Sequence, residues 1–133
     1  MSRAFVREDD GSKAEVPPEI PVSAAPNLVT ARGLRLIDAE IEALNARLVT
    51  ETDPDHVARL RRDLRYWNLR HATARLVTPD PEDPTAQFGA RVTYRTSEDP
   101  EARTVAITGE DEADPASGTL AYTAPLARTL VGV

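Results

Sequence analysis

The sequence contains no cysteine and only two histidines, and these absences exclude several kinds of site. Without thiols, the chain can build neither a disulfide framework nor a thiolate zinc site. The two histidines, His56 and His71, stand apart in a pattern that does not predict a structural metal site. No nucleophile with a matching base is visible either, so we predict that the chain is not an enzyme.

Aromatic residues and long apolar runs are also scarce. Only six of the 133 residues are aromatic, so the core must rest on Leu, Val, Ile and Ala. A ring-lined apolar pocket of the kind that a peptidyl-prolyl isomerase needs is therefore disfavoured. The sequence shows no signal peptide and no apolar run of membrane-spanning length, which predicts a soluble, cytoplasmic protein. The length suits one domain, or a small domain with an extension.

Charge is distributed unevenly along the chain. The formal net charge of -6 argues against a protein coated with nucleic acid. Residues 57–76, however, carry six arginines against the single acid Asp63. The sequence thus predicts one basic helix on an acidic protein.

Two apolar ladders of matched spacing dominate residues 30–77, which we call the finger. Each ladder repeats at intervals of three and four residues, the a/d pattern of a coiled-coil seam. With about seven residues between them (Val49 to Asp55), the two helices must return antiparallel. The ladder residues are Leu34, Ile37, Ile41, Leu44 and Leu48 in the first helix, and Val57, Leu60, Leu64, Trp67, His71 and Ala74 in the second.

Helix-start signals flank both ladders. Thr30 can cap the first helix, and Asp53 followed by Pro54 is a typical start for the second, with Asp55 near the positive end of the helix dipole. Capping alone would explain these tip acids. His71, at a seam position, is expected to be packed or hydrogen-bonded rather than to bind a ligand.

The rest of the chain divides into segments that differ in composition and in the spacing of their apolar residues. Residues 1–29 are Pro-rich and predicted to be extended or disordered, and residues 78–87 form a proline-broken linker. From residue 88 the apolar period becomes two. We expect strands at 90–94, 102–107 and 119–123 and a short helix at 125–131, which together make a small antiparallel sheet domain over 88–133.

Four ordered motifs make residues 27–133 resemble the GreA/GreB family of bacterial transcript-cleavage factors. One opens the finger, one opens the sheet, one is a glycine-bounded acidic loop, and one ends the chain. In this sequence they read Thr30-x-x-Gly33, Phe88-Gly89-Ala90-x-Val92, Ile107-x-Gly109-Glu110-Asp111-Glu112-Ala113-Asp114, and Ala124-Pro125-Leu126-Ala127-Arg128-x-Leu130-x-Gly132.

The resemblance implies an α+β fold, in which an N-terminal antiparallel coiled-coil hairpin is followed by a small FKBP-like antiparallel-sheet domain. It implies that the second domain docks on the rim of the RNA polymerase secondary channel while the finger enters the channel. Tip carboxylates would then help the polymerase hold a Mg²⁺ ion and cut backtracked RNA, because a hard cation needs oxygen ligands. No cofactor would be bound stably by the chain itself.

By this resemblance, each part of the chain acquires an expected role. The tip carboxylates are Glu51, Asp53 and Asp55, of which Asp53 and Asp55 would share the metal transiently. The helix-two arginines expected to contact phosphates near the nascent RNA 3′ end are Arg59, Arg62 and Arg65. The residues expected to bind polymerase are Asp111, Glu112, Asp114, Pro115, Pro125 and Leu126.

The sequence also departs from the family, and an alternative follows. The family's Gly-Asp-Leu-x-Glu-Asn-Ala-Glu-Tyr tip stretch does not occur, and the finger is shorter by several turns. The alternative is a non-cleaving regulator of the secondary channel that competes with Gre factors, like the short-fingered regulator of nucleoside diphosphate kinase. An unrelated interaction module is a further alternative. The family's closing strand is also missing, so we expect either a fragment or an open sheet edge covered by a partner strand, for example one from the N-terminal segment.

Overall fold

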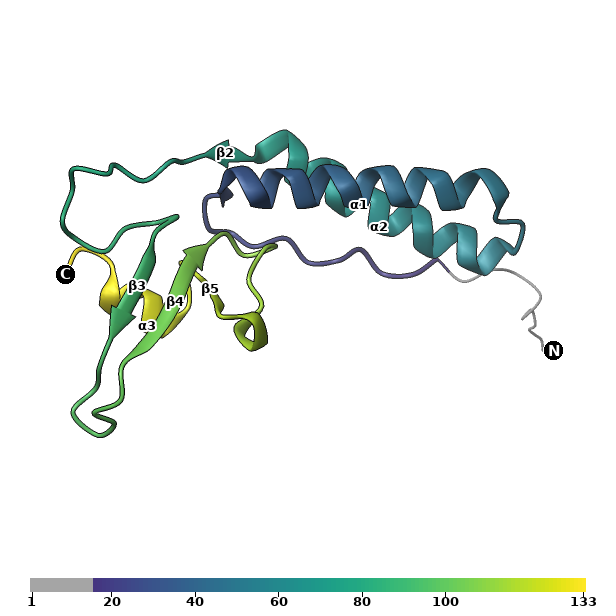
Figure 1. Ribbon diagram of the computed structural model, residues 1–133. Coiled ribbons are helices and arrows are strands. Elements are labelled where there is room, and N and C mark those ends of the chain that lie inside the picture. Colours follow the sequence, from purple (N-terminus) through teal and green to yellow (C-terminus); the bar gives the residue numbers. More distant parts are fainter. Residues whose placement is uncertain (1–15) are drawn as a thin grey trace.

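Two antiparallel helices form the longest part of the molecule. The computed structural model describes residues 16–133, with α1 at Ala31–Thr50 and α2 at Pro54–Thr73 (Figure 1). Each helix has 20 residues, or about 30 Å at 1.5 Å per residue. The loop between them spans only residues 51–53, shorter than predicted, because α2 begins directly at Pro54. No helix among the described residues is long and apolar enough to cross a membrane.

The predicted caps are confirmed at both helix starts. The Thr30 side chain accepts a hydrogen bond from the Gly33 backbone N–H at 2.9 Å. The Asp53 side chain likewise accepts from the Asp55 N–H at 3.0 Å, with Pro54 in the first turn. Each cap satisfies a backbone donor that the helix itself leaves unpaired, so these local sequence signals set where the helices begin.

The predicted seam joins the helices along most of their length. Ile37, Leu44 and Leu60 are buried, and the remaining apolar ladder residues are half-buried. His71 differs, since its side chain is 53% exposed and its Nε2 lies 3.2 Å from Asp38 Oδ1 on α1. The seam therefore ends in a close polar contact between the helices, at a histidine that is exposed and not packed.

The C-terminal sheet is mixed, and the prediction of an antiparallel sheet is wrong. Strand β3 (Arg91–Tyr94) pairs antiparallel with β4 (Arg103–Thr108), but β5 (Thr119–Ala121) pairs parallel with β4. Between β4 and β5 the chain passes through the acidic loop and the 3₁₀ helix η1 (Pro115–Ser117). This connection carries the chain back to the middle of β4, where Thr119 pairs with Ala106, and a tight hairpin turn cannot do this. The short helix α3 follows at Pro125–Leu130.

A small apolar core lies between this sheet and α3. Phe88, Ile107 and Ala127 are its buried members, and the rings of Phe88 and Tyr122 meet edge to face with centroids 5.6 Å apart. Val77, Val92 and Leu120 pack around them. With so few aromatics in the chain, this one pair supplies much of the core's apolar area.

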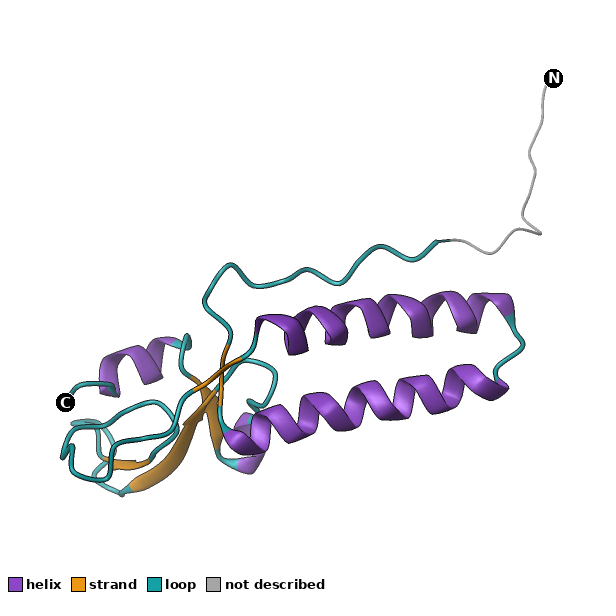
Figure 2. Ribbon diagram, turned by 90° about the horizontal axis from the view of Figure 1, so that it is seen from above, coloured by secondary structure: helices purple, strands orange, loops and turns teal. Residues whose placement is uncertain are grey.

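The end of the N-terminal segment is a strand that the sequence analysis missed. β1 (Leu28–Val29) pairs parallel with β2 (Arg75–Leu76), directly after α2. β1 belongs to a two-stranded ladder that is separate from the C-terminal sheet. Residues 16–27, which we call the arm, run beside the finger toward its base (Figures 1 and 2). Residues 1–15 of the predicted extended segment lie outside the described residues.

Gly109 lets β1 pass close to the end of β4. A Cβ atom on Gly109 would lie 2.2 Å from the backbone oxygen of Leu28. That oxygen belongs to the backbone of a paired strand, so it cannot turn aside as a side chain could. A glycine at this position is therefore required for the base of the finger and the sheet to approach each other.

We predict that Gly109→Ala displaces β1 and destabilises the protein by about 1–3 kcal/mol, the usual cost of overpacking. Hydrogen exchange of the Arg75 and Val77 amides, which donate to Asn27 and Val29 backbone oxygens, reports the displacement directly. Gly118→Ala is the control: substitution strains its backbone (φ +83°), but no atom lies within 4 Å of the added Cβ, so it cannot displace β1. Unchanged protection of both amides in Gly109→Ala would contradict the prediction.

Candidate functional site

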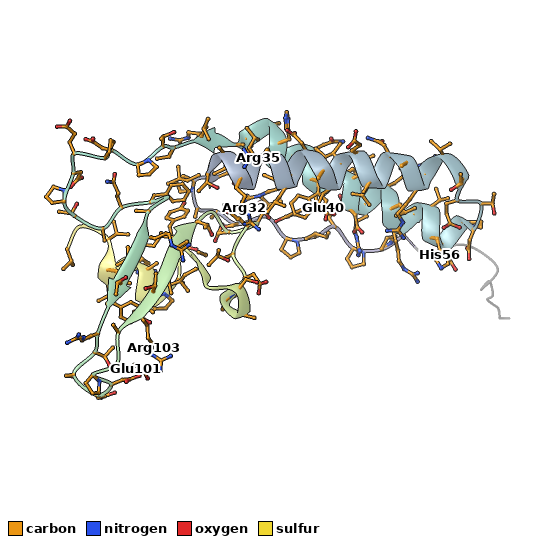
Figure 3. The ribbon with its side chains drawn as sticks, in the orientation of Figure 1. Arg32, Arg35, Glu40, His56, Glu101 and Arg103 are labelled. Atoms are coloured by element: carbon orange, nitrogen blue, oxygen red, sulfur yellow. The ribbon has the colours of Figure 1, made fainter. Side chains whose placement is uncertain are left out.

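The tip of the finger gathers three acids and a histidine. Glu51 Oε2 accepts from the Asp53 N–H at 3.2 Å, while Asp53 Oδ1 caps α2. His56 Nδ1 lies 3.6 Å from both Glu51 Oε2 and Asp53 Oδ2. Figure 3 shows His56 at the end of the finger remote from the sheet. The predicted tip residues Glu51, Asp53 and Asp55 thus lie together, and the first two already contact the local backbone and His56.

Among the described residues, no group of three or more His, Cys, Asp or Glu side chains is arranged to bind a metal. Carboxylate oxygens at an exposed tip suit a hard cation such as Mg²⁺.

The three predicted phosphate-binding arginines of α2 have different surroundings. Arg59 is exposed, and Arg62 is half-buried and paired with its neighbour Asp63 at 2.9 Å. Arg65 binds Glu19 of the arm through two hydrogen bonds, Nε to Oε1 at 2.9 Å and Nη2 to Oε2 at 2.6 Å. The hydrogen bond from Arg65 lowers the pKa of Glu19, and the same bond raises the pKa of Arg65.

A buried arginine joins the arm, the finger and the acidic loop. The Arg70 side chain is only 2% exposed, and its Nε donates to Asp111 Oδ2 at 2.5 Å. Its Nη2 donates to Asn27 Oδ1 at 2.8 Å and lies 3.9 Å from Glu110 Oε1. Because a buried charge needs paired partners, this contact fixes three segments of the chain against one another.

Two further side chains complete this cluster. Asn27 donates back to the Arg70 backbone oxygen at 2.8 Å. The Tyr66 hydroxyl donates to Asp111 Oδ1 at 2.6 Å, so both Asp111 oxygens are occupied. Burial and, next, the hydrogen bond to Asp111 raise the pKa of Tyr66 to about 12. We call Asn27, Tyr66, Arg70 and Asp111 the junction cluster.

Glu112 makes the second contact between the acidic loop and the finger. Its side chain is 5% exposed, with Oε1 accepting from Thr30 Oγ1 at 2.5 Å and Oε2 from Arg32 at 3.0 Å. The carboxylate thus lies at the start of α1, where the helix dipole favours negative charge. A Cβ atom on Gly33 would lie 2.8 Å from Glu112 Oε1, which explains the glycine in the first turn. Arg32 lies at the base of the finger in Figure 3.

The other predicted polymerase-binding residues lie outside these two contacts. Pro115 begins η1 and Pro125 begins α3. Pro115 and Leu126 line a cavity of about 320 Å³, together with Tyr94 and Leu120. Asp114 accepts from Ser117 Oγ at 2.7 Å within the loop. The structure therefore separates the predicted set, with Asp111 and Glu112 facing the finger and Pro115 and Leu126 facing this cavity.

The region around this cavity matches a known family of proteins. The family model described as "Transcription elongation factor, GreA/GreB, C-term" matches residues 73–133. This region of the chain is therefore similar to the C-terminal part of GreA/GreB elongation factors. Factors of this family are accessory proteins of transcription and not catalysts themselves. No curated protein matches the sequence.

Similar solved structures include two from named organisms. The GreA/GreB elongation factor from Nitrosomonas europaea has 17% identity and a TM-score of 0.34, over 80% of this chain and 78% of that one. The GreA factor homolog 1 (Gfh1) of Thermus thermophilus has 12% identity and a TM-score of 0.34, over 82% of this chain and 84% of that one.

Sequence reasoning missed the junction cluster apart from Asp111. In the sequence, Arg70 is one of six arginines between residues 57 and 76, and no local pattern distinguishes it from the exposed ones. Its partners Asn27 and Asp111 are 43 and 41 residues away in the sequence. The one signal in the sequence was the acidic-loop motif, because any buried acid in that loop would need a cationic or hydrogen-bonding partner elsewhere in the chain.

We predict that Arg70→Met lowers the free energy of unfolding by about 3–5 kcal/mol, because it leaves the Asp111 carboxylate buried without its cation. Chemical denaturation measures this change. Arg61→Met, on the exposed surface of α2, is the control and should change stability by about 0.5 kcal/mol or less. The double variant Arg70→Met, Asp111→Leu should recover part of the loss. Equal midpoints for Arg70→Met and Arg61→Met would refute a structural role for the pair.

We also predict a pH effect from Tyr66. Its pKa is raised from 10.0 to about 12 in the folded protein, so between these values the folded state keeps a proton that the unfolded state loses. The stabilisation that Tyr66 gives to the folded state is complete below pH 10 and decreases as the pH rises toward 12. The wild type should therefore lose stability over this window more steeply than Tyr66→Phe. Near-ultraviolet phenolate titration should show one late-ionising phenol that Tyr66→Phe lacks; the absence of such a phenol would count against the prediction.

Proposed function

We propose that this chain is a member of the GreA/GreB family that binds bacterial RNA polymerase and inserts its finger into the secondary channel. The observation that carries the proposal is the combination of a GreA/GreB C-terminal region with a helical hairpin that ends in an acidic tip. Residues 88–133 would form an FKBP-like docking domain, as in the family that the motifs resemble. The finger would then reach about 30 Å from its base, given 20 residues per helix.

Docking would use the surface around the Pro115 and Leu126 cavity. This cavity is lined mainly by apolar and uncharged side chains, which suits a protein partner. Pro125 and Asp114 flank the same region at the start of α3 and before η1. Asp111 and Glu112 would contribute to docking by holding the finger at a fixed angle to this surface, because their carboxylates contact α2 and α1.

At the far end, the tip would stimulate cleavage of backtracked transcripts. Asp53 and Asp55 would offer oxygen ligands to a Mg²⁺ ion held mainly by the polymerase, and Glu51 would keep the loop in shape through the Asp53 N–H. Such an ion can activate the attacking water and stabilise the charge that develops on the phosphodiester. Along the shaft, Arg59, Arg62 and Arg65 would contact phosphates of the extruded RNA near its 3′ end.

The second candidate is a secondary-channel regulator that does not stimulate cleavage and competes with Gre factors. One observation favours it: Asp53 already caps α2 and, with Glu51, lies beside His56. These contacts give the tip acids a structural role that needs no metal. In that case the finger would occupy the channel and act by blocking it.

Cleavage of the nascent transcript in backtracked complexes of the cognate polymerase separates the candidates. The variant Asp53→Asn, Asp55→Asn removes the charges, while asparagine still caps a helix well. We predict that the wild type accelerates cleavage and that this variant, at equal occupancy, loses about 10- to 100-fold of the acceleration, as when a group supporting a metal is lost.

The matched control is Glu40→Gln, Glu42→Gln, which removes two charges from the shaft of α1, and Figure 3 shows Glu40 there. It should cleave like the wild type. If the wild type binds without accelerating cleavage, or protects the transcript from an added Gre factor, the regulator is the correct assignment.

A further inference from the structure

The contact between Glu19 and Arg65 has the geometry with which arginine binds phosphate. Two parallel N–H groups of one guanidinium, Nε and Nη2, reach two oxygens of one anion at 2.9 and 2.6 Å. Guanidinium forks bind carboxylates and phosphates in this same way. A carboxylate of the arm therefore occupies the position that a phosphate would take on Arg65.

The arm is fixed firmly only at the base of the finger. There the buried Asn27 bonds to Arg70 and Thr73, and the Pro26 backbone oxygen accepts from the Tyr122 hydroxyl. Further out, among the described residues, the two hydrogen bonds between Arg65 and Glu19 are the only side-chain hydrogen bonds that join residues 16–24 to α2. Between the two points, a cavity of about 250 Å³ lies under the arm, lined in part by Val22 and Leu69.

This outer attachment is of a kind that solvent and competing ions weaken. The Glu19 and Arg65 side chains are 60% and 53% exposed. Exposed ion pairs contribute little to stability and are screened by salt. Arg62 also lowers the pKa of Glu19 through its charge, so the carboxylate lies in the field of two arginines.

We propose that the arm is an intramolecular competitor of RNA: Glu19 covers the phosphate-binding side of Arg65, and RNA binds there only when the arm lifts away from α2 about Asn27. The proposal rests on the proposed RNA contact of the α2 arginines. It assigns the outer arm a specific role, namely to lower the affinity of the finger for RNA until a phosphate displaces the carboxylate.

Binding of a fluorescently labelled short single-stranded RNA to the full chain, measured by anisotropy, tests the proposal. Glu19→Gln should bind RNA about twofold to fivefold more tightly than the wild type, the range expected when one exposed ion pair no longer competes. Arg65→Gln should bind more weakly, and Glu19→Gln should then have no further effect in the Arg65→Gln background. The gain should shrink as salt rises, because the pair is screened.

Glu82→Gln is the matched control, since it makes the same charge change at an exposed linker residue. Equal RNA affinity for Glu19→Gln and Glu82→Gln, with binding still dependent on Arg65, would overturn the arm's role but leave the RNA contact intact. If neither the wild type nor Glu19→Gln binds RNA through Arg65, the RNA contact fails and the competition fails with it.

A second measurement observes the arm itself. Because the chain has no cysteine, spin labels can be placed uniquely at Ser23→Cys in the arm and Asn68→Cys on α2, both exposed. The label distance should be short in the free protein and lengthen when RNA is added. Glu19→Gln should lengthen it without RNA. A distance that RNA leaves unchanged, while anisotropy shows binding, would overturn the proposal.

Discussion

The ion pair between Arg70 and Asp111 is the contact on which the arrangement of the molecule depends. Taking a guanidinium out of water is costly unless every donor finds a partner. Here the partners come from the acidic loop at 2.5 Å and from Asn27 at 2.8 Å. The finger, the strand β1 and the sheet are thus held together by charge and hydrogen bonding, in addition to the apolar core of Phe88 and Ile107, against which Leu28 of β1 packs.

This constraint changes how the acidic motif of the family is interpreted in this chain. Asp111 and Glu112 have their carboxylates against α2 and α1, with side chains 10% and 5% exposed. Their charges are therefore largely neutralised by Arg70 and Arg32 before any partner arrives. A surface that binds another protein must rely on the exposed remainder, and the apolar cavity beside Leu126 is the part of this region best suited to it. Asp111 and Glu112 thus fix the position of the acidic loop against the finger, while the exposed residues around Leu126 form the surface that a partner could contact.

How well a feature could be predicted from the sequence depends on how far apart in the sequence the interacting residues are. The helices, their caps at Thr30 and Asp53, and the seam come from contacts within a few turns, and the structure confirms them. The parallel pairing of β5 with β4 could not be predicted, because strand direction depends on the route of the connecting loop. The same holds for β1 with β2 and for Arg70 with Asn27, whose members are far apart in sequence. Predictions for the tip and docking residues stay predictions.

Arg65 and Arg70 both form guanidinium–carboxylate pairs, but the two pairs differ in how far they are buried. They lie five positions apart on α2, and each binds a carboxylate through its guanidinium. At Arg70 the side chain is 2% exposed, so breaking the pair would leave charges without solvent, and the contact is permanent. At Arg65, which is 53% exposed, water and salt stabilise the separated charges, and another anion can take the place of Glu19. The same helix thus provides a fixed joint at its base and an exchangeable anion site along its shaft.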